Sequence, residues 1–237
     1  MKHIFLTSAA FWMVSQTSLA TAERPLLLSV PVRHVFVPSG FDDNDNVQVV
    51  LEGAFPDTCH KLAHTEVLKS DDGKSLEVIQ WARKFFGICI PTTVPFTSEV
   101  SLGRLAAGSY TIASVGVAPK AMTVNQAVTS SQDESLYAPV TRVTVGRQDS
   151  GHYMAKIQGR LPNDCFALEK TEIQTQEQVL VLLPVLKYED SGHCSADQKP
   201  IEFMVDLPTD LSAGKYLVHV RSMSGKAVNA VFFADGD

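Results

Sequence analysis

Leu51-Glu52-Gly53-Ala54-Phe55-Pro56-Asp57-Thr58-Cys59 is matched further along the chain by Ile157-Gln158-Gly159-Arg160-Leu161-Pro162-Asn163-Asp164-Cys165, at an offset of 106 positions. At the same offset, Leu105-Ala106-Ala107-Gly108-Ser109-Tyr110 is matched by Leu211-Ser212-Ala213-Gly214-Lys215-Tyr216. Matches that keep one order and one spacing indicate an internal repeat. The sequence therefore predicts two copies of one domain of about 105 residues, a common domain size.

The stretch between the two copies predicts the domain boundary. Residues 125–134 are rich in Ser, Thr, Gln and acidic side chains, a composition typical of a short linker. We predict a signal peptide at 1–22, the first copy at 23–129 and the second copy at 130–237.

The first 22 residues have the layout of a secretory signal peptide. Met1-Lys2-His3 is a basic start, Ile4–Val14 is an apolar run, and Ala20-Thr21-Ala22 is a small-residue cleavage site. The apolar run is shorter than the roughly 20 residues that a membrane-spanning helix needs. We therefore expect cleavage after Ala22, no transmembrane segment in the mature chain, and a periplasmic or secreted location.

The overall charge excludes one class of partner. The chain has 20 Lys and Arg residues against 26 Asp and Glu residues, which gives a formal net charge of -6. Nucleic-acid binding normally requires a basic patch or a high isoelectric point. We expect no nucleic-acid partner.

Short alternating stretches predict strands. Val47–Leu51 and Tyr110–Val115 alternate or nearly alternate between apolar and polar residues, and turn residues bound them. Ser75–Phe86 also fits a helix, but its counterpart Val179–Leu186 contains Pro184, which would break a helix. Both segments are therefore predicted as strands. The fold class that follows is all-β, with two tandem immunoglobulin-like antiparallel β-sandwiches.

The Leu-x-x-Gly-x-Tyr element of each copy carries a resemblance to a known fold. Its tyrosines, Tyr110 and Tyr216, have the spacing of a tyrosine corner, in which the hydroxyl group turns back to the chain just upstream. On this element the chain resembles immunoglobulin-like and fibronectin-III-like modules of secreted bacterial proteins. An antibody-type domain would have a cysteine two positions later, where Ile112 and Val218 stand. The resemblance implies a structural role for both tyrosines and no activity.

The four cysteines predict disulfide bonds. Each copy contributes two of them at equivalent positions, and an exported chain passes into an oxidising compartment. The repeat favours the pairs Cys59–Cys89 and Cys165–Cys194, because the two other connectivities would cross between domains. Closing a loop of about 30 residues stabilises a domain by roughly 3–4 kcal/mol.

One acidic stretch has two interpretations. Asp42-Asp43-Asn44-Asp45-Asn46 is similar to the DxNDN segment of cadherin-type calcium linkers, and its oxygen-bearing side chains suit a calcium ion. It does not fit an EF-hand, because Val47 occupies the glycine position. The alternative is a polar turn between two strands, which Asp and Asn favour. No other cofactor is expected.

The apolar segment around Pro184 predicts a contact surface. Residues 179–186 are apolar on both faces, and a proline inside a strand restricts that strand to an edge or a bulge. An apolar edge strand needs a cover, which either the other domain or a partner protein supplies. Aromatic residues in the first copy are interpreted as core or as further partner contacts. The predicted partner-binding residues are Leu180, Leu182, Leu186, Trp81 and Phe85.

The functional prediction follows from what the motifs include and omit. The sequence contains no nucleophile elbow, metalloprotease motif or phosphate-binding loop, so we do not expect an enzyme. We predict an exported interaction or structural module of the bacterial cell envelope that binds another protein through sandwich edges or loops. The alternative is a calcium-dependent adhesin or carbohydrate-binding module, with a glycan as its ligand.

Overall fold

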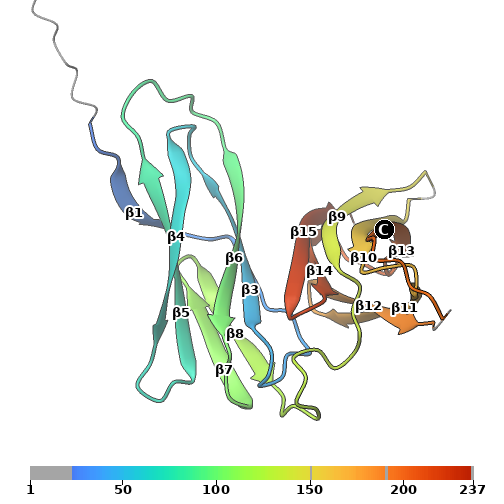
Figure 1. Ribbon diagram of the computed structural model, residues 1–237. Coiled ribbons are helices and arrows are strands. Elements are labelled where there is room, and N and C mark those ends of the chain that lie inside the picture. Colours follow the sequence, from blue (N-terminus) through green and yellow to red (C-terminus); the bar gives the residue numbers. More distant parts are fainter. Residues whose placement is uncertain (1–22, 150, 190–191, 236–237) are drawn as a thin grey trace, which may run out of the picture.

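A computed structural model describes residues 23–149, 151–189 and 192–235, and it shows an all-β chain folded into two sandwiches (Figure 1). The signal peptide predicted at residues 1–22 lies outside the described residues. The predicted fold class is confirmed, as are the two disulfide bonds Cys59–Cys89 and Cys165–Cys194. Across the described ranges, no helix has the length and apolar character needed to cross a membrane.

Sandwich 1 consists of a three-stranded sheet and a five-stranded sheet. The smaller sheet has the order β2-β3-β6, and in the larger one β5 lies between β4 and β7, with β8 beyond β7. Beside β5, β7 pairs with the first half of the strand and β1 with the second half. The strands are β1 Leu26–Val30, β2 His34–Phe36, β3 Val47–Phe55, β4 His60–Lys69, β5 Ser75–Lys84, β6 Val94–Gly103, β7 Gly108–Ser114 and β8 Val117–Val124.

Sandwich 2 has the same connectivity. Its sheets have the orders β13-β10-β9 and β11-β12-β14-β15. Beside the second half of β12, residues 136–138 take the place that β1 has in sandwich 1: Leu136 accepts a hydrogen bond from the Leu186 amide at 2.7 Å. The strands are β9 Val140–Arg147, β10 Tyr153–Leu161, β11 Phe166–Gln176, β12 Val179–Tyr188, β13 Lys199–Asp206, β14 Gly214–Ser222 and β15 Lys226–Ala234.

One pair of strands in each sandwich is parallel, whereas the prediction was of antiparallel sheets. The pairs are β5 with β7 and β12 with β14. Between the two members of each pair the chain makes one strand of the opposite sheet, so the second member returns in the direction of the first. Parallel neighbours need such a crossover, which a hairpin does not supply.

The repeated motif ends β3 and β10, and the structure shows why both copies have glycine there. A Cβ atom on Gly53 would lie 2.4 Å from the ring of Phe96, and one on Gly159 would lie 2.1 Å from the carbonyl oxygen of Pro139. Neither position has room for a side chain. The glycine therefore lets a neighbouring segment approach the strand closely.

Both predicted tyrosine corners sit at the start of their strands. The buried Tyr110 hydroxyl donates to the carbonyl oxygen of Ala106 at 2.7 Å. In sandwich 2 the buried Tyr216 hydroxyl lies 3.1 Å from Oγ of Ser212, at the equivalent position four residues upstream. The same turn is thus closed through the backbone in one copy and through a side chain in the other.

Pro184 predicted either an edge strand or a bulge. The prediction of an edge strand is wrong, because β12 is an interior strand between β11 and β14. The last residue of β12 that pairs with β14 is Leu182. Pro184 follows two residues later, where residues 136–138 replace β14 as the neighbour. A proline at this change of partner removes no hydrogen bond from the pairing with β14.

Candidate functional site

The outer face at the start of β12 packs against sandwich 1. Val179, Val181 and Leu217 of sandwich 2 form one buried cluster with Phe36 and Val50 of sandwich 1. The sequence predicted that either the other domain or a partner protein covers this strand, and the structure shows that the other domain does so.

Three of the predicted partner-binding residues are therefore corrected. The side chains of Leu180, Leu182 and Leu186 are buried in the core of sandwich 2. Successive strand residues point to opposite faces, so the alternate residues, Val179 and Val181, fill the contact between the sandwiches. A strand buried on both faces reads as a continuous apolar run, and no free partner surface follows from it.

A buried ion pair joins the two sandwiches at the acidic turn. Nη1 of Arg221 lies 2.9 Å from Oδ2 of Asp45, and both side chains are almost fully enclosed. The Arg221 guanidinium group also stacks 4.7 Å from the ring centroid of Phe41. Burial raises the pKa of Asp45, and the charge of Arg221 opposes that shift. A single buried charge without a counter-charge would be costly. Arg221 and Asp45 therefore each need the other as a partner, which holds the two sandwiches together at this point.

The rest of the acidic turn is also engaged within the protein. Oδ1 of Asp42 accepts from the Asn44 amide at 2.8 Å, and Oδ1 of Asp43 accepts from the Ala127 amide at 2.9 Å. The Asn46 side chain accepts from Ser101 at 2.6 Å. All three contacts are made within the protein, and the one with Ala127 links the turn to the segment between the sandwiches. The calcium site remains a prediction from sequence, and the geometry adds no support to it.

A second polar connection lies at Glu52. Its carboxylate accepts hydrogen bonds from Lys215 of sandwich 2 and from His34, whose Nδ1 lies 2.9 Å away. Burial alone would raise the pKa of Glu52, but the hydrogen bonds and the charges of Lys215 and His34 together outweigh it and hold the pKa below its ordinary value. The carboxylate is thus charged and paired at neutral pH.

His219 is the fully enclosed titratable group of this interface. Its Nδ1 lies 2.8 Å from Oδ1 of Asn229, its ring meets Phe41 edge-on, and Nε2 has no protein partner. Burial lowers the pKa of His219 to about 4, with the charge of Arg221 acting in the same direction. The imidazole is therefore neutral at physiological pH.

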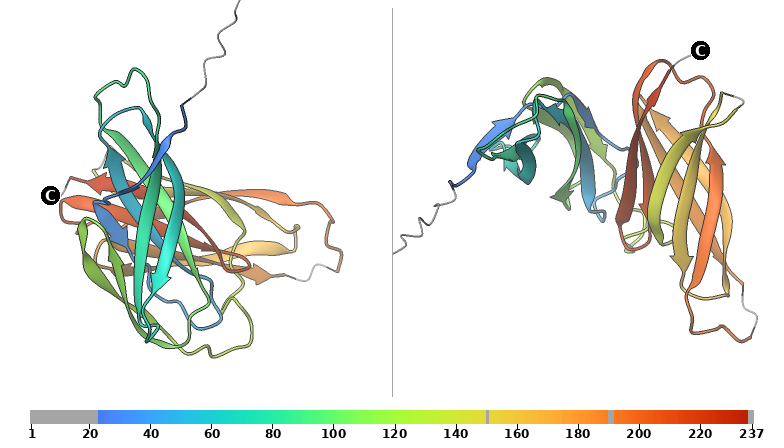
Figure 2. Two further views of the ribbon diagram at one scale, coloured as in Figure 1. Left: turned by 90° about the vertical axis from the view of Figure 1, so that its left-hand side faces the viewer. Right: turned by 90° about the horizontal axis from the view of Figure 1, so that it is seen from above.

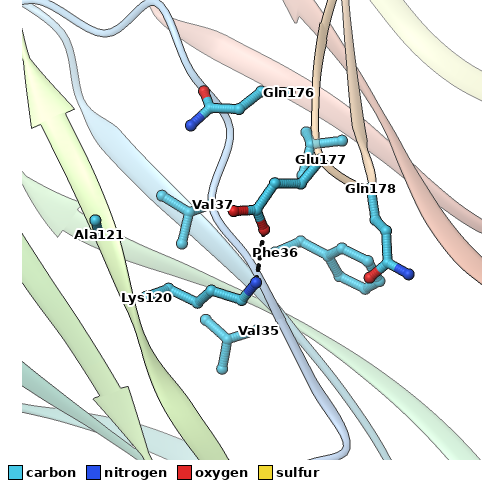
Figure 3. A pocket seen from close by; sticks show the side chains of 9 residues that line it. Val35, Phe36, Val37, Lys120, Ala121, Gln176, Glu177 and Gln178 are labelled. Carbon is cyan, nitrogen blue, oxygen red and sulfur yellow. Dashed lines mark hydrogen bonds and ion pairs between the residues drawn. The ribbon is translucent and has the colours of Figure 1, made fainter.

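Hollows remain along the seam between the sandwiches. Figure 3 shows the side chains around one of them, where Lys120 of β8 reaches Glu177 in the turn between β11 and β12 at 2.6 Å. Its volume of about 30 Å³ is suited to a water molecule and not to an organic ligand. A wider hollow of about 320 Å³ is lined by Phe96, Phe233 and the Glu52–Lys215 pair.

The most distinctive surface of the described chain is the apolar tip, which lies at the disulfide end of sandwich 1. It combines the start of β1, the start of β4 and the loop between β5 and β6 (Figure 1). At its extreme, the Ile88 side chain is 101% exposed. Several large exposed apolar side chains gathered at one end of a domain mark a candidate interaction site. The seven exposed side chains of the tip are Leu26, Leu27, Leu62, Phe85, Phe86, Ile88 and Ile90.

Strand register and the disulfide bond bring these residues together. Leu27 of β1 and Lys61 of β4 both pair with Arg83 of β5. Beyond β5, the Phe85 amide donates to the carbonyl oxygen of Cys59 at 2.9 Å, and Cys89 closes the loop back onto the same cysteine. The loop is thereby held at both of its ends. Its apolar side chains project from a fixed frame, which reduces the entropy lost on binding.

The other two predicted partner-binding residues lie near this end of sandwich 1, Trp81 in β5 and Phe85 just after that strand. Phe85 belongs to the apolar tip and packs 5.4 Å beneath the ammonium group of Lys61. Trp81 is half-buried nearby, stacks on His64, and donates from Nε1 to Glu66 at 3.1 Å. The sequence prediction missed Ile88 and Ile90, and it weighed Phe86 as a core residue or a partner contact. The signal that could have found them is the run Phe85-Phe86-Gly87-Ile88-Cys89-Ile90, which is apolar although Gly87, Pro91 and the disulfide bond mark it as a loop.

Comparison with known proteins agrees with the fold of sandwich 1. Residues 49–124 match the family described as the ORF11 beta-sandwich domain. The match extends from β3 to β8 and covers less than half of the chain. No curated protein and no solved structure matches this chain. The resemblance therefore supports a β-sandwich, and no specific family of bacterial envelope proteins is supported.

Proposed function

We propose that this protein is an exported, non-enzymatic interaction module of the cell envelope that binds another envelope component through the apolar tip. The observation that carries the proposal is the exposure of seven large apolar side chains on one disulfide-held end. Two disulfide bonds indicate an oxidising compartment, in agreement with export to the periplasm or the cell exterior.

The contact between the sandwiches supports this choice of surface. The apolar outer face of β12 and the acidic turn, which the sequence offered as alternatives, are both occupied within the molecule. The tip lies on the side of sandwich 1 away from sandwich 2, so it is free for a partner (Figures 1 and 2). The expectation of a binding partner in the envelope is kept, but its binding surface moves from the buried leucines of β12 to the tip, which contains Phe85.

The test measures, by co-sedimentation, how the purified protein without the predicted signal peptide (residues 23–237) binds to an envelope fraction. The variant Phe85→Glu/Ile88→Ser/Ile90→Ser should bind at least about tenfold more weakly, because central apolar residues carry most of the affinity of an interface. Its melting temperature should stay close to that of the original protein, since the three side chains are exposed.

A matched control is Met204→Gln, which removes an exposed apolar side chain from sandwich 2. It should leave binding unchanged. Equal binding by the folded triple variant would show that the tip is not the interaction surface, and the proposal would then be wrong.

A further inference from the structure

The apolar tip carries a cluster of cationic side chains. Lys61 and Arg83 lie opposite each other in the pairing of β4 with β5, and Lys84 follows in β5. Among the described residues, none of these three forms an ion pair within the protein. In a chain with a net charge of -6, they make this end locally positive.

The acidic groups near the tip offset only part of that charge: the carboxylate of Asp57 interacts electrostatically with Lys84. Asp57 is engaged by His60 at 2.7 Å and by the Cys59 amide. Glu66 lies further along β4 and accepts from Trp81. Lys61 and Arg83, which form no ion pair among the described residues, thus lie beside the apolar side chains of the tip and can meet an anionic surface.

The shape of the tip suits a partner with an extended, deformable surface better than a partner with a preformed pocket. The loop is convex, with the Ile88 side chain projecting fully from it. Aliphatic and aromatic side chains surrounded by Lys and Arg are the pattern that enters the boundary between lipid headgroups and acyl chains.

Resting on the proposed function, we propose that the envelope component bound by the tip is an anionic lipid bilayer. Phe85, Phe86 and Ile88 enter the interfacial layer, while Lys61, Arg83 and Lys84 lie at the lipid phosphates. Apolar insertion and charge attraction contribute separately, so each can be removed alone.

The experiment is co-sedimentation of the purified protein without the predicted signal peptide, residues 23–237, with protein-free vesicles. Vesicles of phosphatidylcholine mixed with phosphatidylglycerol are compared with vesicles of phosphatidylcholine alone. We expect binding to the anionic vesicles that weakens as salt is added. The variant Lys61→Gln/Arg83→Gln/Lys84→Gln should bind about a hundredfold more weakly, and Phe85→Ser/Phe86→Ser/Ile88→Ser should lose binding as well. Inorganic phosphate should not compete, because it supplies the charge without the bilayer.

A control of equal charge change is Arg142→Gln/Lys199→Gln/Lys226→Gln, whose three exposed residues lie on sandwich 2. It should bind the anionic vesicles nearly as well as the original protein. If the folded tip variants bind like the original, the inference is wrong. If the original protein binds the envelope fraction through the tip but not the vesicles, the partner is a protein, and only the lipid inference fails. Binding to neither would overturn the proposed function too.

Discussion

Phe85 and Glu189 occupy the same place in the two sandwiches. The Phe85 amide donates to Cys59 and the Glu189 amide donates to Cys165, each to the carbonyl oxygen of the first cysteine of its disulfide bond. A few residues later, the Ile90 amide bonds Thr58 and the Ser195 amide bonds Asp164. One frame therefore presents an apolar loop in sandwich 1 and a polar loop in sandwich 2.

The outer face of the larger sheet shows the reverse difference. Glu77 of β5 and Val181 of β12 are the third residues of matching parallel pairings. Glu77 is exposed, whereas Val181 is fully buried against sandwich 1. The two copies thus differ in which of their outer surfaces is apolar, and the difference teaches that they divide their contacts. Sandwich 2 packs the outer face of its larger sheet against sandwich 1, whereas the apolar loop between β5 and β6 of sandwich 1 stays exposed.

The largest effect should come from making the two faces alike. Val181→Glu places a carboxylate without a partner in the buried contact, and we expect it to lower the free energy of unfolding by about 4 kcal/mol. The reciprocal change Glu77→Val lies on an exposed face and should alter it by less than about 0.5 kcal/mol. Urea unfolding followed by circular dichroism measures both. Similar effects of the two changes would show that β12 is not covered by sandwich 1.

Removing the disulfide bonds should have a smaller and symmetrical effect. The two bonds close loops with sequence separations of 30 and 29 residues. Cys59→Ala/Cys89→Ala and Cys165→Ala/Cys194→Ala should each cost about 3 kcal/mol in unfolding free energy, because the loop length sets the entropy regained by the unfolded chain. Chemical denaturation of the two variants is the measurement. A difference above about 1 kcal/mol would mean that the apolar and polar loops contribute unequally to the folded state.

A further effect should appear only in acid, and only through sandwich 2. The unfolded His219 binds a proton below its ordinary pKa, whereas burial lowers the pKa of the folded residue to about 4. Protons therefore favour the unfolded state, so stability should fall by up to about 3 kcal/mol as the pH is lowered from about 6.5 to 4. His219→Gln should lack this component. Urea unfolding at both pH values checks the difference, in which the contributions of Asp45 and Glu52 cancel; equal pH dependence in the two proteins would contradict it.

The sequence allowed much of the fold to be predicted and little of the site. The internal repeat and the placement of the cysteines indicated two sandwiches with one disulfide bond each, because both signals lie in short stretches of sequence that occur twice. The environment of β12 could not be predicted, since an apolar residue such as Leu182 looks the same whether it faces its own core or a neighbour. Asp45 suggested a cation, and its observed cation is Arg221, which lies 176 positions away. Such long-range pairs leave no mark in local spacing.

The divided edge of β5 has a consequence for how sandwich 1 is completed. Half of that edge is closed by Leu26–Val30 at the beginning of the chain, and the other half by Gly108–Ser114. Neither closure comes from a hairpin with β5, so both must wait for distant segments to meet, and contacts of this kind make folding slow. A chain that folds from its N-terminal end would leave the edge of β5 half open until β7 arrives. Sandwich 1 is therefore completed as a whole once β7 is present, and not strand by strand in chain order.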